Sequence, residues 1–149
     1  MEAIILVGIQ GAGKTTFYRE RFLDTHVRIS LDLLRTRDRE RVFLQCCLST
    51  QQRFVIDNTN PRAEDRTAYI RTAKAAGFRT VGYFFDVELR DALRRNSKRP
   101  GKGAIPVPGV IGTKKRLEPP TPAEGFDELY VVKLDEQRGF EVSPWQSPS

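Results

Sequence analysis

The chain has 149 residues, of which 25 are basic and 19 acidic, and its formal net charge is +6. This length, with 39% hydrophobic residues, suits one domain with its own core and argues against disorder throughout. Adjacent Cys46 and Cys47, a single histidine and the lack of a long apolar run exclude a disulfide scaffold, a zinc site and a membrane span, so we expect a reduced cytoplasmic protein that contacts no membrane.

Segments typical of strands and of helices alternate along the chain. Short runs of consecutive apolar residues predict buried strands, and longer stretches with apolar residues three or four apart predict helices. In chain order, we expect strands at 4–7, 26–30, 54–57, 80–85 and 129–134, and helices at 14–22, 31–51, 61–76, 88–98 and 107–117.

This alternation predicts an α/β domain with about five parallel strands and helices on both faces of the sheet. We assign residues 1–140 to this domain, whereas the S-P-W-Q-S-P-S ending predicts a disordered tail over residues 141–149. Such sheets bind their ligands at the carboxyl ends of the strands. Gly8, Asp57 and Asp86 are expected at these ends.

Residues 8–15 read G-I-Q-G-A-G-K-T and match the phosphate-binding pattern G-x-x-x-x-G-K-[ST], so we expect a three-layer fold of the P-loop NTPase type. The glycines let backbone N–H groups surround a phosphate, and the positive end of the next helix adds to the attraction. We expect Lys14 on the β- and γ-phosphates of ATP and Thr15 on Mg²⁺. Asp57 is the second candidate metal ligand, although a strand that ends in Asp is also common turn chemistry. The expected nucleotide-binding residues are Gly8, Gly11, Ala12, Gly13, Lys14, Thr15 and Thr16.

A kinase also needs a base for the acceptor and a lid that shields the phosphates from water. Asp32 and Arg35 lie three residues apart on one predicted helix and can face the same acceptor, although a plain surface pair has the same spacing. Arg95 and Arg99 lie four apart where a loop with two glycines begins, which is typical of an arginine-bearing lid.

Basic side chains are concentrated in one part of the chain. Between residues 94 and 116 no acid interrupts them, while acids slightly outnumber bases elsewhere. Such a patch suits a polyanion, either nucleotide phosphates or a nucleic-acid backbone; the alternative is a solvated basic helix and loop. The patch consists of Arg94, Arg95, Lys98, Arg99, Lys102, Lys114, Lys115 and Arg116.

Beyond the P-loop, the chain resembles the 5′-polynucleotide kinase family over most of its length, from Ile4 to about Val132. The resemblance includes three regions that are more specific than a P-loop. They are D-N-T-N-P at 57–61 with Arg66 and Tyr69-Ile70, R-N-S-K-R at 95–99 with Ile105-Pro106, and P-P-T at 119–121 with E-G-F at 124–126.

This resemblance implies transfer of the γ-phosphoryl group of ATP to a 5′-hydroxyl of DNA or RNA. It implies Asp32 as general base, Arg35 as a contact for an acceptor-strand phosphate, and Arg99, helped by Arg95, as the arginine that stabilises the transferring group. No D-x-D signature of the family's phosphatase domain occurs, which implies a kinase-only module. No protein partner is evident. Two alternatives remain, namely a P-loop kinase of a small-molecule hydroxyl and a non-catalytic ATP-binding module.

Overall fold

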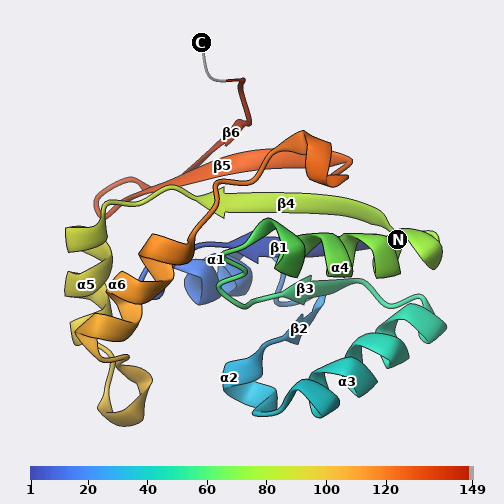
Figure 1. Ribbon diagram of the computed structural model, residues 1–149, viewed down its shortest axis with the longest axis horizontal. Helices are drawn as coiled ribbons and strands as arrows, with labels where there is room; N and C mark the ends of the chain where they lie inside the picture. The colour runs from blue at the N-terminus through green and yellow to red at the C-terminus, as the bar shows by residue number, and fades with distance from the viewer. Residues whose placement is uncertain (148–149) are drawn as a thin grey trace.

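One mixed sheet forms the central layer of the computed structural model, which describes residues 1–147 except for the side chain of Lys102 (Figure 1). The strand order is β2-β3-β1-β4-β5-β6; the first five strands run parallel, and β6 runs antiparallel to β5. The predicted α/β fold is therefore confirmed. The strands are β1 (Glu2–Val7), β2 (Val27–Ile29), β3 (Phe54–Ile56), β4 (Arg79–Phe85), β5 (Glu128–Asp135) and β6 (Gly139–Pro144).

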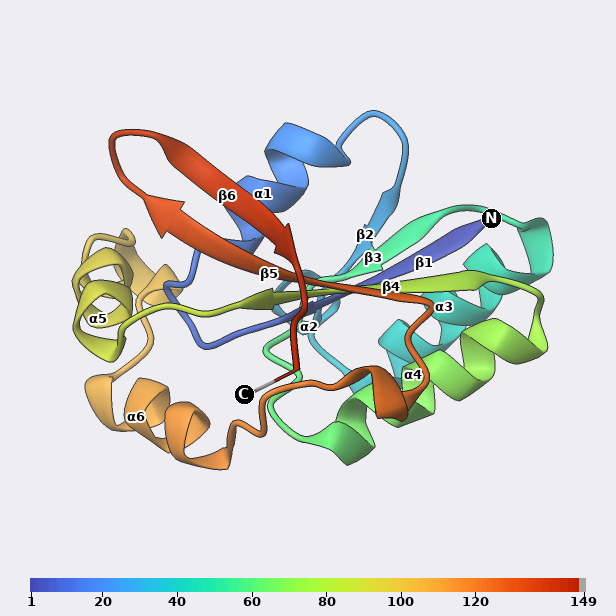
Figure 2. The same cartoon turned by 90° about the horizontal axis from the view of Figure 1, so that it is seen from above.

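Helices flank the sheet because its central strand is apolar on both faces. In β1, Ala3 and Ile5 pack into one hydrophobic cluster with residues of α3 and α4, while Ile4 and Leu6 pack into a second cluster with residues of α1. Helices α5 and α6 lie beyond the carboxyl end of β4 (Figures 1 and 2). The helices are α1 (Lys14–Arg21), α2 (Leu31–Leu34), α3 (Arg37–Thr50), α4 (Ala63–Ala75), α5 (Leu89–Ser97) and α6 (Val107–Arg116), with short 3₁₀ turns η1 (Gly101–Gly103) and η2 (Pro122–Glu124). Within the described residues, none of them combines the length and apolar character needed to cross a bilayer.

The helix predicted over residues 31–51 is two helices. Ser30 caps α2, its hydroxyl accepting from the backbone N–H of Asp32 at 3.2 Å, and the helix ends after one turn. Arg35 then adopts a left-handed φ of 76°, and Thr36 caps the start of α3. Two caps so close in sequence favour a break, which apolar periodicity alone does not reveal.

The prediction of a disordered tail over residues 141–149 is wrong for residues 141–144, which belong to β6. Asp135 Oδ1 accepts hydrogen bonds from the backbone N–H groups of Gln137 and Arg138 in the turn, and Gly139 completes the turn with a φ of 83°. Phe140 then packs against the core of the sheet, so burial of apolar surface favours a paired strand. Residues 148–149 lie outside the described part of the chain.

Arg66 joins three separate segments beneath the carboxyl end of the sheet. Its side chain is fully buried, and it donates to Glu124 from Nε at 2.7 Å and from Nη2 at 2.9 Å. Its Nη1 donates to the carbonyl groups of Asn60 and Pro61 at 2.9 and 3.1 Å. The arginine of α4 therefore fixes both the turn before β5 and the loop after β3.

We expect Arg66→Ala to lower the free energy of unfolding by about 3–5 kcal/mol, because it leaves the buried Glu124 carboxylate without its partner. Urea unfolding followed by circular dichroism measures this loss. Arg71→Ala, on the exposed side of the same helix, is the control and should stay within about 0.5 kcal/mol of the wild type. Equal losses in the two variants would show that the buried pair contributes nothing specific.

Candidate active site

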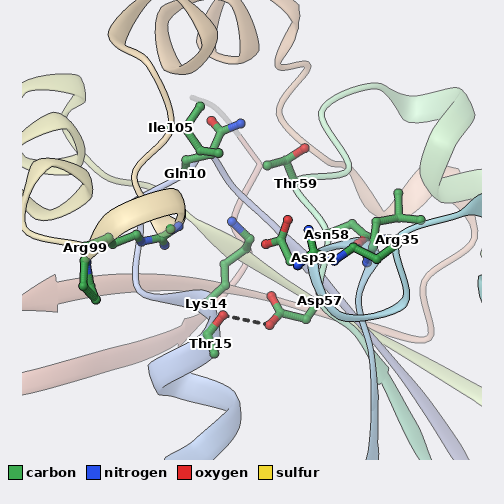
Figure 3. A pocket seen from close by; sticks show the side chains of 13 residues that line it. Gln10, Lys14, Thr15, Asp32, Arg35, Asp57, Asn58, Thr59, Arg99 and Ile105 are labelled. Atoms are coloured by element: carbon green, nitrogen blue, oxygen red, sulfur yellow. Dashed lines mark hydrogen bonds between the residues drawn. The ribbon is translucent and has the colours of Figure 1, made fainter.

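A cavity of about 590 Å³ lies at the carboxyl ends of the central strands (Figure 3). Side chains reach it from the P-loop and α1, from α2, from the loop after β3, and from the segment after α5. The cavity therefore brings together groups that are far apart in the sequence. Six of the residues singled out from the sequence line it: Lys14, Thr15, Asp32, Arg35, Asp57 and Arg99.

The P-loop follows β1 and turns sharply into α1. Gly11 and Gly13 both have left-handed φ values, of 79° and 96°. At Gly11 a Cβ atom would lie 2.1 Å from the carbonyl oxygen of Ala92 in α5, so no other residue fits there without movement of the backbone. Gly8, Ile9 and Ala12 are also buried, and Thr16 is exposed. Of the predicted nucleotide-binding residues, Lys14 and Thr15 line the cavity, whereas Gly8, Gly11, Ala12, Gly13 and Thr16 do not.

Lys14 is buried at the start of α1. In the absence of phosphate, its Nζ donates to the carbonyl groups of Gly8 and Ile9 at 2.9 and 3.1 Å. Burial lowers the pKa of Lys14 to about 8, an effect that Asp57 opposes and Arg99 reinforces. A phosphate at the P-loop would restore the charged form.

Thr15 and Asp57 meet beside the lysine. The Thr15 hydroxyl donates to Asp57 Oδ2 at 3.0 Å (Figure 3), and the carboxylate side chain is 2% exposed. Two adjacent oxygen ligands fit Mg²⁺, which prefers hydroxyl, carboxylate and phosphate oxygens. Arg28 of β2 also contacts this pair, since its Nε donates to the same Oδ2 at 2.8 Å. Sequence reasoning missed Arg28; a charged residue in the middle of a short apolar strand was the one available signal.

Helix α2 forms another side of the cavity. The exposed Asp32 follows the cap of this short helix, and Arg35 ends it. The two side chains line the same cavity. We predicted that they share one helix face, but Arg35 lies in the turn that follows α2. Asn58 Oδ1 accepts the backbone N–H of Leu31 at 2.9 Å and so anchors the helix.

A buried polar network supports that anchor, and sequence reasoning missed it as well. Glu40 of α3 is 5% exposed; its Oε2 accepts from Asn58 Nδ2 at 2.8 Å and its Oε1 from the Tyr69 hydroxyl at 2.7 Å. Burial and this bond to Glu40 raise the pKa of Tyr69. The network joins α3 and α4 to the position of α2. A glutamate at a helix position otherwise facing the core was its sequence signal.

The two predicted lid arginines have different positions. Arg99 lines the cavity opposite Asp32 and Arg35 (Figure 3). Arg95 does not line it: its Nε donates to the carbonyl oxygen of Gly11 at 2.6 Å, because α5 packs directly against the P-loop. The segment between Asn96 and Ile105 carries Arg99. The side chain of the buried Asn96 joins the two ends of this segment, since it pairs with both backbone groups of Ile105 at 2.6 and 3.1 Å.

The predicted basic patch is divided between α5 and α6, which pack together. Arg94 is paired with Glu136 and Asp91. The side chain of Lys102 lies outside the described residues. Four of the remaining side chains are exposed and form a basic surface after α5 and at the end of α6: Lys98, Lys114, Lys115 and Arg116.

Comparison with known proteins places these features in a family. A family model described as an AAA domain matches residues 4–111. The bifunctional polynucleotide phosphatase/kinase of Schizosaccharomyces pombe is 25% identical over 146 residues; the match covers 94% of this chain and 35% of the relative. The predicted resemblance to polynucleotide kinases is therefore confirmed, and the chain spans about a third of this relative.

Solved structures agree on the fold. Kti12 of Chaetomium thermophilum, in complex with ADP-AlF3, has a TM-score of 0.67 at 17% identity, with 91% of this chain and 92% of that chain covered. A gluconokinase of Sinorhizobium meliloti has a TM-score of 0.61 at 17% identity, with 89% and 82% covered. The fold is that of the P-loop kinases.

The lowered pKa of Lys14 makes nucleotide binding depend on pH. Phosphates favour the charged lysine, so binding takes up a proton once the free lysine is neutral. We expect the dissociation constant for ADP to be constant below about pH 7 and to rise by up to tenfold per pH unit above about pH 8. Isothermal titration calorimetry measures both the affinity and the proton uptake. Lys14→Arg, which stays charged, should lose this pH dependence whatever its absolute affinity; an equally pH-dependent variant would contradict the assignment.

Proposed function

Since the chain belongs to the AAA domain family of P-loop proteins, we propose that it transfers the γ-phosphoryl group of ATP to a 5′-hydroxyl end of DNA or RNA. One observation carries the proposal. A single cavity holds a phosphate-binding Lys14 and Thr15 on one side and an Asp32–Arg35 pair on the other. The first pair suits the donor and the second an acceptor hydroxyl that is followed by a phosphate.

On the donor side, Lys14 leaves its backbone carbonyl partners and contacts the β- and γ-phosphates. Arg99, which faces the cavity from the lid segment, stabilises negative charge that develops on the transferring group. Thr15 and Asp57 would hold Mg²⁺, which supplies charge neutralisation of the phosphates when it is bound.

On the acceptor side, Asp32 orients the 5′-hydroxyl and accepts its proton as the new O–P bond forms. The bond between the γ-phosphorus and the oxygen that bridges it to the β-phosphate breaks, and ADP leaves with the electron pair. Arg35 binds the phosphate that follows the first nucleoside. Asn58 and Glu40 hold α2, and with it Asp32, at a fixed distance from the P-loop.

Two observations support a polynucleotide acceptor over a small molecule. Exposed basic side chains follow α5 and end α6, the two helices on either side of the cavity-lining segment from Arg99 to Ile105, and they suit a chain of phosphates. The relative from Schizosaccharomyces pombe carries the name of a polynucleotide kinase. A small alcohol would need no basic surface outside the cavity.

Transfer of labelled γ-phosphate to acceptors tests the proposal. We expect labelling of single-stranded DNA or RNA oligonucleotides that carry a 5′-hydroxyl, and none of the same oligonucleotides that carry a 5′-phosphate. A panel with gluconate, other sugars and nucleosides tests the small-molecule alternative. Transfer to a member of that panel alone would replace the proposal, and ADP binding without transfer to any acceptor would favour a non-catalytic module.

Asp32→Asn keeps the shape of the side chain but removes the base. We expect turnover to fall by about 10²–10⁴-fold, the usual contribution of a general base, with little change in ATP affinity. Asp38→Asn, which removes an exposed carboxylate at the start of α3, is the control and should keep turnover. Near-normal turnover in Asp32→Asn, with a loss in Asp57→Asn, would move the base to Asp57.

Acceptor binding should weaken as salt rises, because basic side chains displace counterions from the nucleic acid. With three or four phosphate contacts to a single strand, we expect a slope of about −2 to −3 for the logarithm of the association constant against that of the salt concentration. Fluorescence anisotropy with a labelled 5′-hydroxyl oligonucleotide measures the slope. Lys114→Gln with Lys115→Gln should make it shallower, whereas a salt-independent affinity would point to a small acceptor.

A further inference from the structure

Arg28 is the one charged side chain that contacts both expected metal ligands within the described residues. Its Nε donates to Asp57 Oδ2 at 2.8 Å, and its Nη2 lies 3.3 Å from the Thr15 hydroxyl and 3.5 Å from that of Ser30. The side chain is 22% exposed and does not line the cavity. Arg28 thus lies behind the pair, where it contacts the ligands and not the substrates.

The contact of Arg28 with Asp57 lowers the affinity of the site for a cation. Asp57 Oδ2 accepts from Thr15 and from Arg28 together, so a cation that binds this oxygen competes with two donors. Two acids, Asp32 and Asp57, are outnumbered by four bases at or beside the cavity, namely Lys14, Arg28, Arg35 and Arg99. Without a nucleotide, the site therefore repels divalent cations.

Bound nucleotide phosphates offset the excess of positive charge at the site. An ADP or ATP molecule at the P-loop brings several negative charges and phosphate oxygens, which are ligands that Mg²⁺ readily shares with one or two protein groups. We propose that Arg28 is a positioning residue that makes divalent-cation binding at Thr15 and Asp57 depend on bound nucleotide, so that the metal enters only together with the phosphates. This inference rests on the donor half of the proposed function.

A plain structural role is the alternative. In that case Arg28 only neutralises a buried carboxylate at the edge of the sheet, and its loss lowers stability without creating a cation site. The two roles differ in one measurable quantity, the affinity of the nucleotide-free protein for a divalent cation. A structural role leaves this affinity unchanged.

Binding of Mn²⁺ to the full chain, followed by electron paramagnetic resonance with and without ADP, tests the proposal. We expect weak binding by the nucleotide-free wild type and a dissociation constant about tenfold lower or more for Arg28→Gln, because one cation beside the ligands has been removed. Arg28→Lys keeps the charge and should stay close to the wild type. Adding Asp57→Asn to Arg28→Gln should remove the gained site.

Arg79→Gln, in strand β4 of the same sheet and paired with Glu128 at the surface, is the matched control and should not bind Mn²⁺ more tightly. Circular dichroism selects folded variants, and Arg28→Met supplies a second neutral side chain if Arg28→Gln unfolds. Unchanged Mn²⁺ affinity in a folded neutral variant, or tight binding by the nucleotide-free wild type, would overturn the role of Arg28 alone. A wild type that binds no ADP would overturn the proposed function, and with it the nucleotide dependence.

Discussion

Two hydrogen bonds tie the end of β1 and the start of the P-loop to the loop after β3, and the geometry of the site depends on them. The backbone N–H of Gly8 donates to Thr59 at 3.0 Å, and Asn60 Nδ2 donates to the carbonyl group of Leu6 at 2.8 Å. Because β1 and β3 are neighbouring parallel strands, their carboxyl ends already lie together. The two bonds turn this proximity into a fixed arrangement, so the P-loop and Asp57 share one support.

The two sides of the cavity rest on different elements. The P-loop side is held by α5, which packs on Gly11, and by the bonds to the loop after β3, whereas the side formed by α2 depends on Asn58 and its buried partner Glu40. A change in the α2 segment can therefore alter that side of the cavity without disturbing the P-loop.

Local patterns were enough to predict the P-loop, the five parallel strands and six of the residues that line the cavity, since each depends on a motif or on spacing along the chain. The contacts of Arg28 and Glu40 were not predictable, because they depend on which strand or helix becomes a neighbour in three dimensions. Arg95 has the spacing of a lid residue, but the packing of α5 turns it toward Gly11. The strand at 139–144 depends on a turn that only its partner β5 stabilises.

The contact between Gly11 and α5 leaves no space for a methyl group, and Arg95 adds a bond from the helix to the same residue. The P-loop and α5 consequently behave as one mechanical unit, with no hinge between them. Motion over the cavity is then confined to the segment between Asn96 and Ile105, which the Asn96 side chain closes into a small ring. A chimera between related proteins must therefore exchange the segment between Asn96 and Ile105 alone. If it also exchanges α5, it must exchange the P-loop with Gly11 as well.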